Sequence, residues 1–359
     1  MRAAVLLGEG MIACQEVPMP PLRDDQVMVR VESCGICGSD LRYLQGENPW
    51  AMHTLGEERA NPPRMILGHE FSGVVASAGS PRWRPLIGKR VAVQAFRGCG
   101  FCHQCRSGRE NLCPNTEHIG HGAGWKDLEW NPGAMAEMCP AWGEMCYALP
   151  DHVTFDEGVF LDGLGVAVHA VNRAQLRSGE VAFVLGCGPI GLSVAQVAKA
   201  YGARLVAVSD VYDKALETAR ELRLDWVLDA RSEDVVHSVS AATGDLGADA
   251  IFDTVGAAET LQQAVAVSAP GARIVLMAGL AGGATVEPLR LAGERSVTVS
   301  ANNNYREFLI GLQLLASGRV KVRPLITHRF PLLRVEEAFR MAANKVSTGA
   351  IKVVINPQA

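Results

Sequence analysis

The sequence has no excess of positive charge. Its 359 residues include 34 Lys and Arg against 38 Asp and Glu, which gives a formal net charge of −4 and a pI near 6.2. There is no basic stripe for a nucleic acid, so that class of partner is disfavoured. Internal repeats and low-complexity tracts are also absent. The remaining composition, 48% hydrophobic and 20% charged, is ordinary for a soluble globular protein.

We expect neither a signal peptide nor a membrane-spanning segment. The first ten residues carry one positive charge and an apolar run that is too short for a signal peptide. Residues 181–198 carry no charge and are long enough to span a membrane, but Gly186, Gly188, Pro189 and Gly191 would break a helix in their first half. We interpret them as a buried strand, a tight turn and the start of a helix. We expect a cytoplasmic protein with no membrane partner.

The length suits about two domains. The first 150 residues hold short β-like runs between turn signals, such as 26–31 and 89–94, and predict an antiparallel, barrel-like region. From about residue 156 apolar strands alternate with helices, the pattern of a doubly wound parallel sheet. The expected strands are 181–185, 204–208, 226–228, 250–252 and 273–277, and the expected helices are 189–201, 214–222 and 257–268. A further helix over 308–317 and a last strand over 349–355 close the chain.

A glycine motif indicates where a dinucleotide binds. Gly186, Gly188 and Gly191, with Pro189 and Ile190 between them, follow an apolar strand and open a helix. Such glycines permit a tight turn and close approach of a pyrophosphate to the helix N-terminus. Asp210 ends the next strand, where an acid binds the ribose hydroxyls and repels a 2′-phosphate. The motif therefore predicts NAD rather than NADP.

Six of the ten cysteines are clustered, and four of these have the spacing of a closed metal site. Without a secretory signal, clustered cysteines favour metal over disulfides. Four thiolates can surround one structural zinc and leave no position open for substrate. An iron–sulfur cluster is the rival, but its cysteine run has three residues before the final Cys, and this one has seven. The four ligands are Cys99, Cys102, Cys105 and Cys113.

A second metal site of a different type is indicated by Cys37 and His69. A catalytic zinc typically keeps three protein ligands and one open position. Cys37 lies in the run Gly35–Asp40, and His69 lies between Gly68 and Glu70. Cys34 is interpreted as a small core residue.

These motifs together resemble the zinc-containing medium-chain alcohol dehydrogenase family, and within it the sorbitol and threonine dehydrogenase branch. They occur in the family's order and cover nearly the whole chain. The resemblance implies a GroES-like catalytic domain over residues 1–163 and 299–359, and a Rossmann domain over 164–298. It also implies two zinc ions per chain, NAD, and a homodimer or homotetramer.

The resemblance further implies roles for single residues. Cys37 and His69 match the first two catalytic zinc ligands, and Asp162 stands where polyol dehydrogenases carry a Glu as the third. Glu70 is the alternative or exchanging ligand. Ser39 matches the hydroxyl that passes the substrate proton towards solvent, and Asp40 matches the acid that orients the histidine. The zinc would act as a Lewis acid, and hydride would pass to the nicotinamide.

We expect a secondary alcohol of polyol type to be interconverted with a ketone. The polar segment 45–65 favours hydroxylated substrates if it lines the site, and it is equally compatible with a plain surface loop. Threonine, butanediol and simple alcohols are alternative substrates. A non-enzymatic, zinc-stabilised NAD sensor is the alternative of another class, and it would predict a missing ligand or relay residue.

Overall fold

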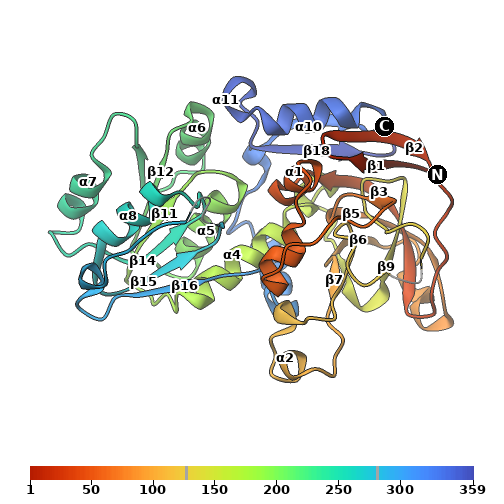
Figure 1. Ribbon diagram of the computed structural model, residues 1–359, viewed down its shortest axis with the longest axis horizontal. Helices are drawn as coiled ribbons and strands as arrows, with labels where there is room; N and C mark the ends of the chain where they lie inside the picture. Colours follow the sequence, from red (N-terminus) through yellow and green to blue (C-terminus); the bar gives the residue numbers. More distant parts are fainter. Residues whose placement is uncertain (126–127, 280–282) are drawn as a thin grey trace. The chain divides into compact units, whose positions relative to one another are not determined.

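The structure is a computed structural model that describes residues 1–125, 128–279 and 283–359 (Figure 1). The chain forms two compact units. Unit 1 comprises residues Met1–Asp162, Asn304–Leu312 and Ile326–Ala359, and unit 2 comprises Gly163–Asn303 and Gln313–Leu325. Each unit is described by itself below.

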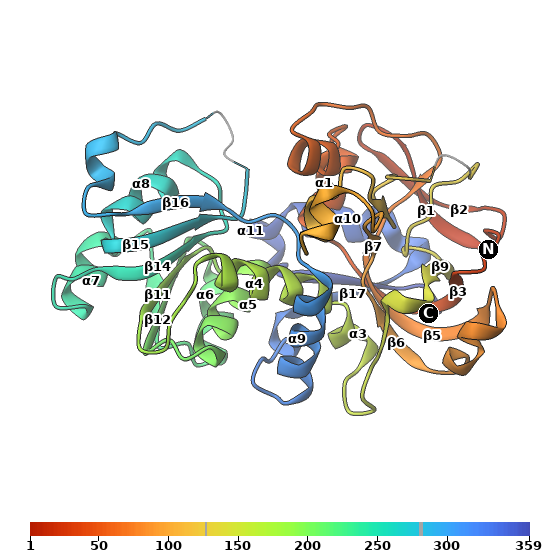
Figure 2. The ribbon, with the colours of Figure 1, turned by 90° about the horizontal axis from the view of Figure 1, so that it is seen from below.

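Unit 2 is built on a six-stranded sheet in which every neighbouring pair is parallel (Figure 2). The strand order is β13-β12-β11-β14-β15-β16. The strands are β11 (Val181–Leu185), β12 (Leu205–Asp210), β13 (Trp226–Asp229), β14 (Ala248–Asp253), β15 (Ser268–Leu276) and β16 (Ser296–Val299). The helices α5 (Pro189–Ala200), α6 (Asp213–Glu221), α7 (Val235–Ala242) and α8 (Ala258–Ala266) connect them. The predicted doubly wound parallel sheet is confirmed.

The strands of this sheet form because they are apolar on both faces. All five residues of β11 are buried, as expected for a central parallel strand that is covered by helices on both sides. The uncharged stretch 181–198 is therefore β11, the glycine turn and most of α5. No helix in the described part of the chain is both long and apolar enough to cross a membrane.

Unit 1 is mainly antiparallel. Its largest sheet has the order β10-β6-β5-β3-β18-β17, and β9 also pairs with β3. Its strands are β3 (Gln26–Gly35), β5 (Glu70–Ala78), β6 (Arg90–Val93), β9 (Met138–Trp142), β10 (Cys146–Ala148), β17 (Ile326–Pro331) and β18 (Lys352–Asn356). A three-stranded sheet joins β2 (Met11–Glu16), β1 (Arg2–Gly8) and β4 (Met65–Ile66), and a small one joins β7 (Phe96–Arg97) to β8 (Glu117–His118).

The helices of unit 1 are short, as its sequence predicted. They include α1 (Gly38–Leu44), α2 (His103–Arg106), α3 (Phe155–Gly158), α10 (Val335–Ala343) and α11 (Lys345–Thr348), with a π-helix over Ala51–Leu55. Two longer helices belong partly to each unit: α4 (Leu161–Arg173) and α9 (Tyr305–Ala316). The segment 45–65, for which the sequence left a site-lining segment and a plain surface loop equally open, contains one helical turn of the rare π type.

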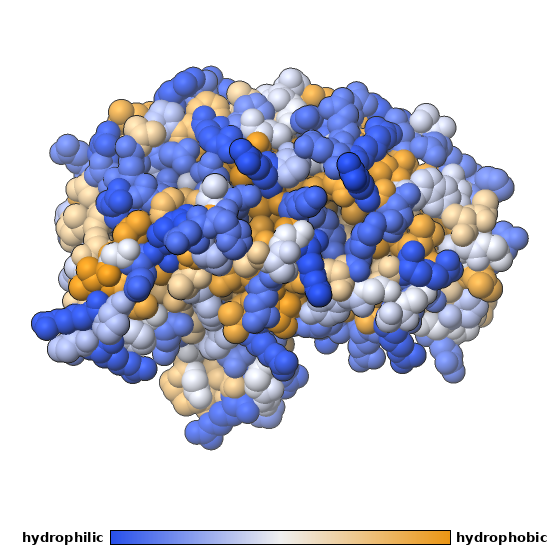
Figure 3. Space-filling model, turned by 180° about the vertical axis from the view of Figure 1, so that it is seen from behind, coloured by the Kyte–Doolittle hydropathy of each residue, from blue (hydrophilic) through white to orange (hydrophobic). Residues whose placement is uncertain are grey.

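The core of unit 1 is centred on two stacked tryptophans. The rings of Trp125 and Trp142 lie 5.4 Å apart at an angle of 18°, and both are fully buried. Arg23 lies over the first ring and Arg97 over the second, at 4.9 and 5.2 Å. These guanidinium groups therefore make cation–π contacts with the stacked rings. On the surface, Figure 3 shows hydrophilic side chains spread over one face of the molecule among smaller hydrophobic areas.

Candidate functional site: two metal centres and a dinucleotide turn

The first candidate metal ligand lies where β3 ends and α1 begins. Cys37 occupies the N-cap position of α1, and its backbone N–H donates to Oδ2 of Asp40 at 2.8 Å. Asp40 is fully buried and also accepts a hydrogen bond from the N–H of Gly68 at 3.3 Å. One carboxylate thus joins the segments that carry Cys37 and His69.

His69 follows a glycine that no other residue can replace without strain. Gly68 has a φ of +96°, and a Cβ at this position would lie 2.8 Å from the backbone nitrogen of Met135. This tight turn brings His69 directly ahead of β5. His69 Nδ1 lies 3.7 Å from Oδ1 of Asp40, on the side where a buried acid can orient the ring.

Three ligand atoms converge at this point. Those of Cys37, His69 and Glu70 all lie within 4.8 Å of one another. Glu70 is not free, however, because its Oε2 lies 2.5 Å from Nζ of Lys352, and both side chains are buried. Lys352 Nζ also donates to the carbonyl of Ile36 at 3.3 Å. The acid nearest to Cys37 and His69 is therefore already engaged with an ammonium group.

Asp162 lies at the start of α4 and is half-buried. It is not part of the three-residue group, but its charge raises the pKa of His69. Asp162, which the resemblance gives as the third ligand, therefore acts electrostatically on His69.

The donor set of this centre fits a cation. Burial lowers the pKa of His69, but Asp40, Cys37 and Asp162 outweigh it and raise the pKa to about 10. Such negative surroundings favour a bound cation, which would displace the proton. In addition, Ser39 Oγ and His69 Nδ1 are buried and have no hydrogen-bond partner among the described residues. His69 Nδ1 faces Asp40, whereas the unsatisfied Oγ of Ser39, two residues after Cys37, indicates a binding site, because unsatisfied buried polar atoms are rare in proteins.

The second centre unites the four cysteines of the sequence motif. The sulfur atoms of Cys99, Cys102, Cys105 and Cys113 lie within 4.8 Å of one another, and none of these residues forms a disulfide. The N–H of Cys99 donates to Sγ of Cys113 at 3.3 Å, and the N–H of Cys105 donates to Sγ of Cys102 at 3.4 Å. Backbone donors of this kind stabilise thiolates. The set fits a closed tetrahedral zinc site.

The thiols of this four-cysteine lobe differ in their pKa values. Burial raises the pKa of Cys99, but backbone donors outweigh it and lower the pKa to about 6. Burial raises the pKa of Cys105 to about 12. Neighbouring thiolates repel one another, so a divalent cation is what would allow all four to ionise together.

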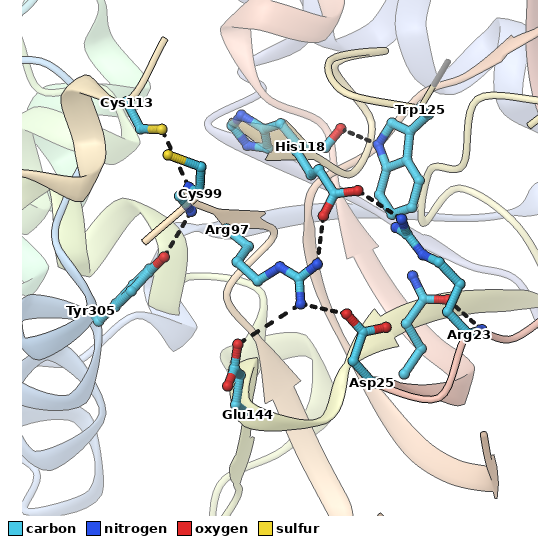
Figure 4. Close-up of polar contacts among 12 residues, drawn as sticks. Arg23, Asp25, Arg97, Cys99, Cys113, His118, Trp125, Glu144 and Tyr305 are labelled. Carbon is cyan, nitrogen blue, oxygen red and sulfur yellow. Dashed lines mark hydrogen bonds and ion pairs between the residues drawn. The ribbon is translucent and has the colours of Figure 1, made fainter. Parts of the chain in front are cut away.

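Polar contacts join the cysteine lobe to the barrel (Figure 4). The N–H of Gly98 donates to the Tyr305 hydroxyl at 2.7 Å. The adjacent Arg97 forms ion pairs with Asp25 and Glu117, each at 2.6 Å. The lobe is therefore tethered at its root through β7, while α2 lies in the loop beyond it (Figure 1).

The dinucleotide motif forms the predicted turn. Gly186 has a φ of +97°, and a Cβ on Gly191 would lie 1.9 Å from the carbonyl oxygen of Gly186. At Gly188, the N-cap of α5, a Cβ would meet nothing within 4 Å. The first and last glycines are thus required by the fold, whereas the middle one leaves open space at the N-terminus of the helix, where a pyrophosphate can bind.

Asp210 closes this turn. Its carboxylate accepts hydrogen bonds from the backbone N–H groups of Cys187 at 2.5 Å, Val211 at 2.6 Å and Tyr212 at 2.9 Å. The acid at the end of β12 therefore holds the glycine turn against its own strand end.

Four residues near the first centre were not predicted from the sequence. Lys352 is one, and the others are Tyr43, His118 and His121. The ring of His121 lies 4.3 Å from that of His69 and 4.0 Å from that of His118. No motif marks them. The pair of histidines three residues apart is the only signal that the sequence offers.

Comparison with known proteins agrees with this geometry. Residues 23–151 match the alcohol dehydrogenase GroES-like domain, and residues 189–317 match the zinc-binding dehydrogenase domain. A sorbitol dehydrogenase of Bombyx mori is 32% identical over 99% of this chain and 98% of its own length. An L-idonate 5-dehydrogenase of Vitis vinifera is 32% identical over 99% of this chain and 94% of its own length.

Solved structures show the same fold. The Escherichia coli oxidoreductase ECK1772, whose specificity is unknown, superposes with a TM-score of 0.89, at 28% identity and with 99% and 98% of the two chains covered. An E. coli alcohol dehydrogenase in complex with NADH has a TM-score of 0.85, at 28% identity and 99% coverage of both chains. A zinc-binding dehydrogenase of Sinorhizobium meliloti bound to NADP has a TM-score of 0.87, with the same identity and coverage.

This chain belongs to the zinc-dependent medium-chain alcohol dehydrogenase family, in the sorbitol dehydrogenase branch. It is an oxidoreductase that uses zinc and a nicotinamide cofactor on small alcohols and ketones. The predicted GroES-like and Rossmann domains are confirmed. The sensor hypothesis has no support, because the relatives are named as enzymes.

Proposed function

We propose that this enzyme interconverts a secondary hydroxyl of a polyol and the matching ketone, with NAD as the hydride carrier. The observation that carries the proposal is the convergence of Cys37, His69 and Glu70. The relatives named for sorbitol and L-idonate support a polyhydroxylated substrate.

The catalytic zinc would be held by Cys37, His69 and one acid. Glu70 is closer to the other two ligands, but it can bind the metal only by leaving Lys352. Asp162 is half-buried and influences His69, so it remains our first choice for the third ligand. The charge balance is suitable in either case, since one thiolate and one carboxylate offset a divalent cation.

The residues around the metal have separate tasks. A zinc held by these ligands would supply Lewis acidity for ionising the substrate hydroxyl, and a bound nicotinamide would supply the hydride acceptor. Ser39 accepts the hydroxyl proton at its unpaired Oγ and passes it towards solvent. Asp40 positions His69, and it is itself fixed by the N–H groups of Cys37 and Gly68.

NAD is the proposed cofactor because Asp210 stands where a 2′-phosphate would lie. A carboxylate there repels that phosphate and can accept hydrogen bonds from ribose hydroxyls. Gly186, Gly188, Pro189, Ile190 and Gly191 would bind the pyrophosphate. The relatives do not decide the matter, since one was solved with NADH and another with NADP.

Further parts of the assignment are proposals of the same kind. Unit 1 would be the catalytic domain and unit 2 the nucleotide-binding domain. A second, structural zinc would occupy the four-cysteine lobe. We also propose a cytoplasmic homodimer or homotetramer. Elemental analysis should find two zinc ions per chain, one resistant to chelators and one labile; a single zinc, or iron with visible absorbance, would contradict the two-site assignment.

The substrate class is tested by NAD reduction with a panel of sorbitol, other polyols, cyclitols, butanediols, threonine and simple alcohols. We expect kcat/KM to be highest for a polyol. A clear preference for threonine or for an unsubstituted alcohol would replace the polyol proposal, and reduction of NADP in preference to NAD would replace the cofactor proposal.

A further inference from the structure

A tyrosine and two histidines form a polar cluster next to the metal ligand His69. Tyr43 lies on α1, one turn after Asp40, and is fully buried. His118 ends β8, His121 lies in the turn that follows, and each is 7% exposed. The ring centroids of His69 and His121 lie 4.3 Å apart, and those of His121 and Tyr43 lie 5.3 Å apart. All four residues belong to unit 1.

One ring nitrogen of His121 is committed to the protein. Its Nδ1 lies 3.0 Å from the hydroxyl of Tyr43, which is also 3.3 Å from the His121 carbonyl and 3.4 Å from Oδ1 of Asn48. The other ring nitrogen, Nε2, has no hydrogen-bond partner in the described part of the chain. The Nδ1 atom of His121 is therefore occupied by Tyr43, whereas its Nε2 atom is available to bind a ligand.

The available nitrogen suits a hydroxyl in either tautomer. If Tyr43 donates to Nδ1, then Nε2 carries the ring proton and donates. If Nδ1 donates to Tyr43, then Nε2 accepts. A hydroxyl both donates and accepts, so it can pair with Nε2 in both cases, whereas a methyl group can pair with it in neither.

A second observation points to a ligand at the same place. Nδ1 of His118 is buried and has no partner among the described residues, and the His118 ring lies 6.0 Å from that of His69. Buried polar groups are normally satisfied, so this unpaired nitrogen near His69 indicates a polar ligand.

We infer that His121 is a specificity-determining residue which hydrogen-bonds the hydroxyl on the carbon next to the reacting one. The inference rests on the proposed function and narrows its substrate class to alcohols with a neighbouring hydroxyl. The rings of His69 and His121 lie 4.3 Å apart, so a hydroxyl next to one that a metal on His69 would hold is expected within reach of His121. Tyr43 is a positioning residue that fixes the imidazole.

The test compares two alcohols that differ by one hydroxyl, 2,3-butanediol and 2-butanol, on the zinc-loaded enzyme with NAD. His121→Leu should lower kcat/KM for the diol by about tenfold or more, because the hydroxyl loses its partner. The value for 2-butanol should change less than about threefold. His121→Gln, whose amide both donates and accepts, should recover part of the diol activity. Tyr43→Phe should also reduce the preference for the diol over 2-butanol, by a smaller factor.

A binding measurement separates recognition from turnover. With NADH present no alcohol can be oxidised, so calorimetry reports affinity alone. His121→Leu should weaken binding of the diol to the NADH complex and leave that of 2-butanol unchanged. His152→Leu, a change at a histidine outside the cluster, is the matched control and should alter neither.

The outcomes distinguish this inference about His121 from the proposed function on which it rests. If the unmodified enzyme oxidises neither alcohol and no polyol, the proposed function fails. If it oxidises the diol but His121→Leu lowers both substrates equally, or neither, while zinc content and NAD binding are intact, the inference about His121 is wrong and the proposed function stands.

Discussion

Lys352 Nζ and Glu70 Oε2 form a buried ion pair 2.5 Å long beside the first metal centre. Burial lowers the pKa of Lys352, but the charge of Glu70 outweighs this effect and raises it, so the lysine is charged at neutral pH. Lys352 comes from β18 and Glu70 from β5, and β3 lies between these two strands in the sheet. The lysine thus restrains the acid that stands closest to the metal ligands.

Removing one partner of this pair should destabilise the protein. Lys352→Met leaves Glu70 buried without its counter-charge, and we expect the free energy of unfolding to fall by about 3–5 kcal/mol. The double variant Lys352→Met with Glu70→Gln should recover most of this loss. Urea denaturation of the metal-free protein and of its single and double variants measures these free energies of unfolding. Additive losses in the double variant would show that the two side chains do not stabilise one another.

The third zinc ligand can be identified by two variants studied side by side. Asp162→Asn keeps the shape of the side chain but removes its charge, so most of the catalytic zinc and most of the turnover should be lost. NAD binding and the four-cysteine zinc should remain. Glu70→Gln should do less, although losses around a metal site can still reach tenfold. Zinc content and kcat are measured for both.

The opposite result has a definite meaning. If Asp162→Asn retains full metal and rate while Glu70→Gln loses both, then the ligand set is Cys37, His69 and Glu70, and Lys352 is displaced when the metal binds.

Cofactor preference should depend on Asp210. Asp210→Ser removes the charge that repels a 2′-phosphate, so the ratio of kcat/KM for NADP to that for NAD should rise about tenfold or more. The affinity for NAD should fall as well, because the carboxylate also holds the N–H of Cys187 in the glycine turn. Asp229→Asn, at the end of the neighbouring strand β13, is the control. A preference for NADP in the unmodified enzyme would contradict the role of Asp210.

Stability at low pH should depend on Asp156. This carboxylate accepts hydrogen bonds from Ser33 at 2.5 Å and Asn356 at 3.1 Å, and pairs with Arg329 at 2.5 Å. Burial raises the pKa of Asp156, but these three partners outweigh it and lower the pKa below its usual value. A depressed pKa in the folded state stabilises the protein above the unfolded-state value of about 3.9, and this contribution is lost as the pH falls through the folded-state pKa.

Asp156→Asn should therefore lower the free energy of unfolding at pH 7 by about 1–3 kcal/mol. The difference from the unmodified protein should shrink as the pH falls below about 4. The control is Asp151→Asn, at a fully exposed side chain nearby, which should change little. A difference that stays constant from pH 7 to pH 3 would rule out the electrostatic explanation.

The fold could be predicted where the chain is locally periodic. All five expected strands of the parallel sheet and the helices between them are present, because buried parallel strands are continuous apolar runs. The sequence did not reveal α7 or β16. The four residues of β16 are mostly exposed at the sheet's edge, so they lack the apolar signal of the other strands.

The site could be predicted only where its residues lie in motifs. Cys37, His69 and the four clustered cysteines are recognisable because their neighbours are constrained, as the φ of +96° at Gly68 shows. Lys352 is 282 residues from Glu70, and Tyr43 is 78 residues from His121. Partners so far apart leave no local pattern, because only the tertiary fold brings them together.

The discontinuity of unit 1 affects when this centre can mature during synthesis. Cys37, His69 and Glu70 emerge early, but the lysine that neutralises Glu70 arrives on β18, which also completes the sheet by pairing with β3. Until then the nascent unit carries a carboxylate without its counter-charge and an uncovered strand edge. Loading of the metal centre is therefore expected to follow the folding of β18 onto β3.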